Sequence, residues 1–167
     1  QPSNSKNIFG PPKWMRQLIQ PPPGYGMSYV DWGANEFGIA AFLSEDPLMI
    51  AAYRSPCPYL WFAMKVGHAP EEATKQSHPQ TREKFKTLCL ALIYGQGRNG
   101  ISTRLNVLPV EADALMQLHN RTFKVFWDWS DNVVSKALLN RKMVSVFGWQ
   151  YHVRSEEYDD RGVRQGP

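Results

Sequence analysis

The sequence predicts an α+β protein that is rich in helix and contains little sheet. Amphipathic patterns of helical period fill most of residues 35–140, whereas only two short stretches, 27–32 and 143–153, have the composition of strands. The chain has 167 residues, of which 43% are hydrophobic, so it is long enough to bury a core.

Proline and glycine dominate the N-terminal region. Two proline clusters exclude a long helix over residues 1–26, and a short helix is predicted between them at residues 14–19. Residues 27–32 are predicted to form a strand, because this short apolar stretch contains tyrosine and valine and follows a glycine-rich turn.

Helices are predicted to follow this strand as far as residue 140. Pro47 and Pro109 stand where two of them begin, and the fixed φ angle of proline suits a first helical turn. The glycine-rich run that starts at Gly95 ends the longest helix. Beyond residue 140, the alternation around Phe147-Gly148 predicts a β-hairpin over residues 143–153. The predicted helices cover residues 35–43, 46–53, 58–66 and 71–94, a short segment ending near 105, and 109–140 with one break.

Composition sets limits on the class of protein. The net charge of +4 favours anionic partners only weakly. Cys57 and Cys89 lack the spacing of a metal site, so free or buried thiols in a reducing compartment are predicted. No apolar run approaches the about 20 residues of a membrane span, so no membrane partner is expected. The chain starts with Gln rather than Met, which indicates a fragment or a processed product.

The most informative pattern is a series of residues spaced by four, Arg82, Lys86, Leu90 and Tyr94, followed at once by Gly95. On an α-helix this spacing places the side chains in one slanting stripe, with cations first and apolar groups last. Cations near a helix N-terminus suit a triphosphate, and an apolar surface suits a base. An amphipathic core helix with two solvated cations would show the same spacing.

A second segment decides between these interpretations. The run from Tyr29 to Ala40 contains Asp31, Trp32 and Glu36 in the order Asp, aromatic, three variable residues, Glu. This run and the stripe resemble motifs A and B of family A DNA polymerases, the group of bacterial DNA polymerase I and many phage enzymes. Asn7-Ile8 resembles the family's Gln-Asn-Ile turn, and Gly148-Trp149 resembles a pair that closes a late hairpin. The motifs stand in the family's order along most of the chain.

The resemblance implies a fragment of a right-hand polymerase, comprising part of the palm and most of the fingers. Residues 1–44 would be a palm segment with the motif A strand, residues 45–142 the fingers helices with motif B, and residues 143–167 a hairpin and the start of the return to the palm.

The resemblance also implies template-directed DNA synthesis, in which a deoxynucleotide joins a primer 3′ end by two-metal phosphoryl transfer. Asp31 and the backbone carbonyl of Trp32 would be metal ligands, with Mg²⁺ as the ion and Asp31 a catalytic residue. The implied partners are primer-template DNA, dNTP and the remainder of the polymerase chain. The implied location is the cytoplasm of a bacterial or phage-infected cell.

The resemblance assigns the other site residues as well. Arg82 and Lys86 would hold the triphosphate, with Lys86 also catalytic, and Glu36 would lie near the incoming sugar. Leu90 would pack beside the incoming base. The residues expected to contact DNA are Asn7, Tyr94 and Gly95.

The chain departs from the family pattern at several places. Leu90 stands where phenylalanine or tyrosine is usual, and Gly38 stands where an arginine follows the motif A glutamate. The His-Asp-Glu of motif C is absent, and the polar surroundings of Asp159-Asp160 are unlike it. One carboxylate cannot hold two ions, so the chain alone is predicted to be inactive in polymerisation.

Two other functions fit parts of the sequence. Residues 88–94 could be a strand leading into Gly95-x-Gly97-x-x-Gly100, which is the spacing of a dinucleotide-binding loop. A non-catalytic nucleic-acid-binding module would use the six tryptophans and the mild basicity, and it would not need Asp31.

Overall fold

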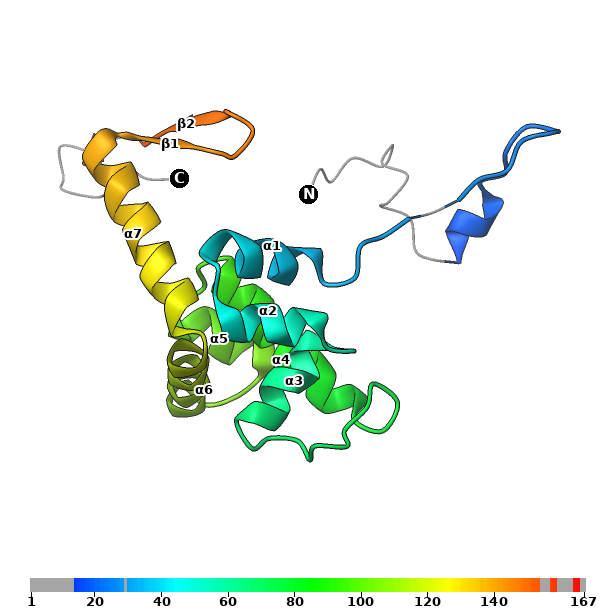
Figure 1. Ribbon diagram of the computed structural model, residues 1–167, viewed down its shortest axis with the longest axis horizontal. Coiled ribbons are helices and arrows are strands. Elements are labelled where there is room, and N and C mark those ends of the chain that lie inside the picture. The colour runs from blue at the N-terminus through cyan, green and yellow to red at the C-terminus, as the bar shows by residue number, and fades with distance from the viewer. Residues whose placement is uncertain (1–13, 29, 154–156, 159–163, 166–167) are drawn as a thin grey trace. The chain divides into compact units, whose positions relative to one another are not determined.

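The computed structural model describes residues 14–28, 30–153, 157–158 and 164–165, and the chain divides into two compact units, residues 1–33 and 34–167 (Figure 1). The N-terminal unit contains the predicted short helix as the 3₁₀ helix η1, Met15–Leu18. The strand predicted over residues 27–32 is wrong, because residues 27–28 and 30–32 adopt no regular structure. Apolar composition alone does not make a strand, which also requires a neighbour for its hydrogen bonds.

The second unit is helical, as predicted. Its helices are α1 Asn35–Ser44, α2 Pro47–Arg54, α3 Pro58–Lys65, α4 Pro79–Ile93, α5 Arg98–Leu105, α6 Pro109–Thr122 and α7 Lys124–Asn140. Proline occupies the first position of α2, α3, α4 and α6, where the missing N–H would have no partner. Within the described ranges, no helix is long and apolar enough to cross a membrane.

The longest predicted helix begins later than expected, at Pro79 instead of residue 71. Thr74 and Ser77 each accept a hydrogen bond from the other's backbone N–H, with N···O distances of 3.1 and 2.9 Å. These local bonds hold the segment in turns, because serine and threonine side chains compete with helix hydrogen bonding.

The predicted hairpin is present at the end of α7 (Figure 1). Strands β1, Lys142–Val144, and β2, Gln150–His152, pair antiparallel with Met143 opposite Tyr151. Gly148 occupies the turn with a φ of 79°, a conformation that glycine adopts without strain. Strands β3, Glu157–Tyr158, and β4, Arg164–Gln165, form a separate antiparallel pair.

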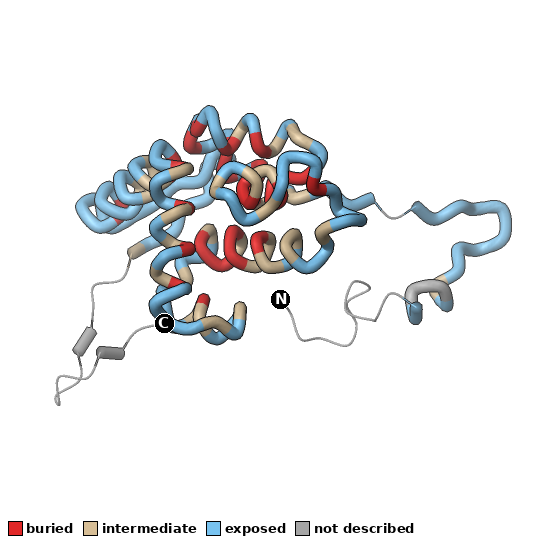
Figure 2. The backbone as a smooth tube through the Cα atoms, turned by 90° about the horizontal axis from the view of Figure 1, so that it is seen from below, coloured by how far each residue is buried: buried red, intermediate tan, exposed pale blue. Residues whose placement is uncertain are grey.

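Aromatic rings form the centre of the helical core, and the buried positions lie on the sides of the helices that face one another (Figure 2). Phe62 of α3 contacts Phe85, Phe123 and His119 at centroid distances between 5.1 and 5.4 Å. Each buried phenylalanine contributes about 1.5–3 kcal/mol through area removed from water. This cluster joins α3, α4, α6 and the start of α7, so it fixes α4 against its neighbours.

Candidate functional site

The stripe on α4 is helical from Arg82 to Leu90, and Tyr94 and Gly95 end the helix. Gly95 donates to the carbonyl of Leu92 and Gln96 donates to that of Ala91, both at 2.9 Å. This pair of bonds is a Schellman motif, which requires a left-handed residue after the helix. Gly95 has a φ of 74°, so the helix end itself accounts for a glycine here.

The two sides of α4 differ in exposure. Phe85, Leu88, Cys89 and Leu92 are buried on the core-facing side of the helix, and Ile93 is only partly buried. The stripe is accessible, since the side chains of Arg82 and Lys86 are 31% and 37% exposed and Tyr94 is 68% exposed. α4 is thus a core helix on one side and offers two cations and an aromatic ring on another.

Glu36 lies in the first turn of α1, which packs against α4. Glu36 and Tyr94 both line a cavity of about 290 Å³, whose walls come from α1, the end of α4 and α7. Its remaining lining residues are Ile39, Ala40, Leu43, Ile93, Phe126, Trp129 and Ser130. The cavity offers an apolar surface with one carboxylate at its edge.

Tyr59 of α3 is a buried tyrosine on which charges of both α1 and α4 act. Burial, followed by Cys89 and Glu36, raises the pKa of Tyr59 to about 12, while the charge of Arg82 acts in the opposite direction. Tyr59 is 3% exposed, and its phenol stays protonated at neutral pH. Sequence patterns did not indicate Tyr59, because Glu36 and Cys89, which act on it, belong to two other helices, α1 and α4.

Glu83 is a second residue that the sequence analysis did not single out. Its carboxylate lies 3.2 Å from Arg82 Nη1 and 3.7 Å from Lys86 Nζ. Its spacing of three from Lys86 was the available signal.

Gly38 has a packing explanation. A Cβ atom at this position would lie 2.7 Å from the ring of Tyr53, closer than van der Waals contact permits. The arginine that the family places here would therefore require Tyr53 to move.

The other predicted site residues belong to the N-terminal unit or lie outside the described residues. Asp31 and Trp32 belong to the N-terminal unit, where both are exposed. Asn7 and the Asp159-Asp160 pair lie outside the described residues. Across the part of the chain that the structure describes, no group of three or more His, Cys, Asp or Glu residues could hold a metal ion.

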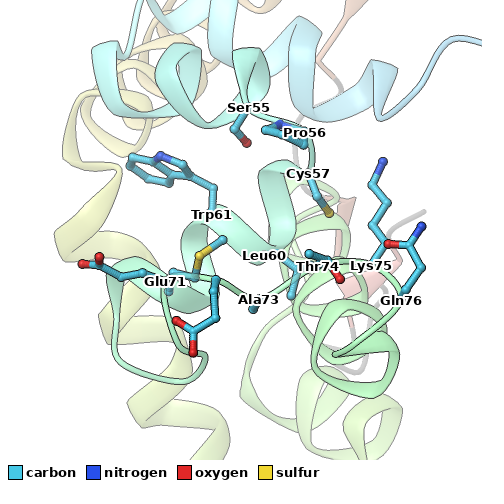
Figure 3. Close-up of a pocket in the computed structure, with 12 residues that line it drawn as sticks. Ser55, Pro56, Cys57, Leu60, Trp61, Glu71, Ala73, Thr74, Lys75 and Gln76 are labelled. Atoms are coloured by element: carbon cyan, nitrogen blue, oxygen red, sulfur yellow. The ribbon is translucent and has the colours of Figure 1, made fainter.

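A larger cavity of about 630 Å³ lies elsewhere in the helical unit (Figure 3). It is formed by the α2–α3 link, by α3 and by the loop over residues 71–76, with Trp61 and Leu60 on one wall. Its lining, so far as the described residues define it, includes none of the residues predicted to bind nucleotide.

The dinucleotide-binding alternative is wrong. Residues 88–93 are the C-terminal half of helix α4 instead of a strand, and Gly100 lies inside α5. The glycine spacing therefore follows a helix, whereas a dinucleotide-binding loop joins a strand to a helix.

The helical arrangement defines a piece of a polymerase domain. The structure is similar to the POL domain of Pol1 from M. smegmatis, solved in complex with DNA primer-template and dNTP, with a TM-score of 0.64 and 25% sequence identity. The match covers 73% of this chain and 21% of that one.

Sequence relatives agree with this class. DNA polymerase I of Synechocystis sp. is 22% identical over 134 residues, covering 80% of this chain and 13% of the relative. DNA polymerase I of Aquifex aeolicus is 28% identical over 127 residues, covering 71% of this chain and 21% of the relative. The family model for DNA polymerase family A matches residues 7–166, and the chain belongs to that family.

Proposed function

We propose that this chain is the motif A and motif B part of an enzyme that performs template-directed DNA synthesis, and that α4 binds the incoming dNTP. The observation that supports this most is the accessible stripe on α4, with Arg82 and Lys86 followed by Leu90 and Tyr94. The chain spans between 13% and 21% of the length of the relatives it matches, so the activity belongs to a longer polymerase.

The stripe can hold the parts of a nucleotide in order. Arg82 binds phosphate oxygens through its planar guanidinium, and Lys86 adds a point charge that also stabilises negative charge developing on the leaving phosphates. Leu90 packs beside the base. Tyr94 and Gly95 lie by the templating base, and Glu36 restricts the space around the sugar.

The proposed metal ligands belong to the N-terminal unit. Asp31 supplies a carboxylate oxygen and Trp32 a backbone carbonyl oxygen, both of which suit Mg²⁺. Two ions need further carboxylates, which the remainder of the polymerase chain supplies in this proposal. An Mg²⁺ ion held there by Asp31 and the Trp32 carbonyl would supply charge neutralisation for the phosphates and activation of the primer 3′ oxygen.

The same proposal assigns each region of the chain to a part of the polymerase domain. Residues 1–44 belong to the palm, residues 45–142 to the fingers and residues 143–167 to the hairpin that leads back to the palm. Asn7 contacts DNA, together with Tyr94 and Gly95.

Substitution of Lys86 tests the nucleotide assignment. Lys86→Ala is expected to weaken dNTP binding at least tenfold with binding of a DNA duplex nearly unchanged, because the triphosphate loses a direct charge partner. Lys84→Ala is the matched control, since Lys84 is on the same helix but pairs with Glu111 of α6 at 2.8 Å. Titrations of both ligands measure the effect, and equal losses for dNTP and duplex would contradict the assignment.

Substitution of Asp31 separates an enzyme from a binding module. In the polymerase that contains this chain, Asp31→Ala is expected to abolish primer extension while leaving DNA binding in place. A non-catalytic nucleic-acid-binding module would keep every activity after this change.

A further inference from the structure

One carboxylate lies between the two cations of the stripe. Glu83 Oε2 accepts a hydrogen bond from Arg82 Nη1 at 3.2 Å, and Glu83 Oε1 lies 3.7 Å from Lys86 Nζ. Both oxygens of one side chain are thus engaged by the two residues that are proposed to hold the triphosphate. Arg82 Nε is buried and has no hydrogen-bond partner among the residues that the structure describes.

These ion pairs contribute little to the stability of α4. The side chain of Glu83 is 59% exposed, and water and salt screen exposed ion pairs strongly. Their effect on an anionic ligand is larger, because carboxylate and phosphate oxygens compete for the same N–H donors. A phosphate that replaces the carboxylate at Arg82 and Lys86 also remains close to it, since Glu83 stays on the same turn of helix.

We propose that Glu83 is a specificity-determining residue of the nucleotide site, an inference that rests on the function proposed above. Glu83 holds Arg82 and Lys86 when no nucleotide is bound, and it lowers the affinity for polyphosphates that carry no metal ion. Repulsion from the carboxylate grows with the charge of the ligand, and a metal-free nucleoside triphosphate carries roughly twice the net charge of its Mg²⁺ complex. Glu83 therefore selects the metal complex over the free nucleotide.

Glu83→Gln tests this by removing the charge at nearly constant size. The matched control is Glu111→Gln, which removes the same charge from another ion pair of α4, the contact with Lys84 at 2.8 Å. The dissociation constant of dATP is measured with the 167-residue chain at low salt, once with a chelator and once with excess Mg²⁺. Glu83→Gln is expected to tighten binding about tenfold for free dATP and about threefold for the Mg²⁺ complex, with Glu111→Gln within twofold of wild type.

Several results would overturn the inference. The inference fails if Glu83→Gln binds dATP no more tightly than wild type. It also fails if the gain in affinity is the same with and without Mg²⁺, or if Glu111→Gln shows an equal gain. Glu83→Ala is the second variant, with the same expected gains, and circular dichroism verifies that each variant folds. If Lys86→Ala weakens dATP binding while Glu83→Gln changes nothing, only this inference fails. If Lys86→Ala has no effect, the proposed function fails.

Discussion

The carboxylate of Asp46 joins the first turns of two helices, because its Oδ2 accepts a hydrogen bond from the backbone N–H of Phe126, 80 positions away, at 3.0 Å. Its Oδ1 accepts from the N–H groups of Leu48 and Met49 at 2.9 and 3.0 Å. First-turn N–H groups lack acceptors within their own helix, and helix N-termini attract anions. Asp46 thus satisfies donors of α2 and α7 together, and it holds the part of α7 that forms a wall of the cavity beside Glu36.

Removal of this carboxylate is expected to destabilise the helical unit. Asp46 is 1% exposed, so Asp46→Ala leaves three N–H groups without their partner and lowers the free energy of unfolding by about 2–4 kcal/mol. Asp46→Asn keeps one acceptor oxygen and is expected to lose about half as much. Urea unfolding followed by circular dichroism measures both.

The control for this prediction is Asp128→Ala. Asp128 also belongs to α7 and bonds Lys124, but both side chains are exposed. Its loss is expected to cost less than about 0.5 kcal/mol. A cost for Asp46→Ala as small as that of the control would show that the bridge between α2 and α7 does not hold the fold.

A buried histidine makes the stability of this unit depend on pH. His119 is fully buried among aromatic rings, and its Nδ1 accepts a hydrogen bond from Trp127 Nε1 at 3.1 Å. Burial lowers the pKa of His119 to about 3, from an ordinary value of 6.5. Between these values the unfolded chain binds a proton that the folded chain does not, so stability is present above pH 6.5 and is lost as the pH falls toward 3.

Comparison with His119→Phe isolates this contribution. As the pH is lowered from 6.5 to 4, the free energy of unfolding of wild type is expected to fall relative to that of the variant by up to about 1.4 kcal/mol for each pH unit. Urea unfolding at half-unit intervals measures the difference, and carboxylates that titrate in the same range cancel in the comparison. A constant difference across this interval would mean that His119 is protonated in the folded state or does not titrate at all.

The helices could be predicted from the sequence because their signals are local. Pro47 and Pro109 mark the starts of α2 and α6, and the apolar spacing of α4 indicates its buried face. The two wrong predictions have different causes, because a strand needs a neighbouring strand whereas local side-chain hydrogen bonds can replace a helical turn. Residues 27–28 and 30–32 have the composition of a strand but no strand structure, and side-chain hydrogen bonds between Thr74 and Ser77 hold turns where the sequence predicts helix.

Part of the candidate site could be predicted from the sequence, and part of it depends on how the helices pack. Arg82, Lys86, Leu90 and Tyr94 lie along one helix and its C-terminal end, so their alignment could be predicted from their spacing. Glu36 and Tyr94 line the same cavity because of the way α1, α4 and α7 pack together. This packing cannot be predicted from the spacing of residues within one helix. Tyr59 was missed for the same reason. The resemblance assigned Gly95 a contact with DNA, whereas its positive φ gives it a structural role as well.

Gly95→Ala separates these two roles. Because φ is 74°, an alanine at this helix end is expected to cost about 1–2 kcal/mol of stability, although a Cβ would meet no atom within 4 Å. Gly97→Ala is the control, since Gly97 has a φ of −83° and equally open space, and its cost is expected to be clearly smaller. Thermal and urea unfolding compare the two. Equal costs would argue against strain at Gly95, and a loss of duplex binding without loss of stability would favour the contact role alone.

Leu90→Phe tests whether the third residue of the stripe contacts the base. Leu90 is partly exposed on α4, between the cations and Tyr94. An aromatic ring there is expected to strengthen dNTP binding by about 0.5–1.5 kcal/mol, or roughly two- to twelvefold, because it can stack on the base. Inorganic triphosphate is the control ligand, since it shares the phosphates but has no base, and its affinity should not change. Titration of both ligands against the wild type and the variant decides the question. A gain for both would assign the effect to the phosphate end of the stripe, and a gain for neither would place the base away from Leu90.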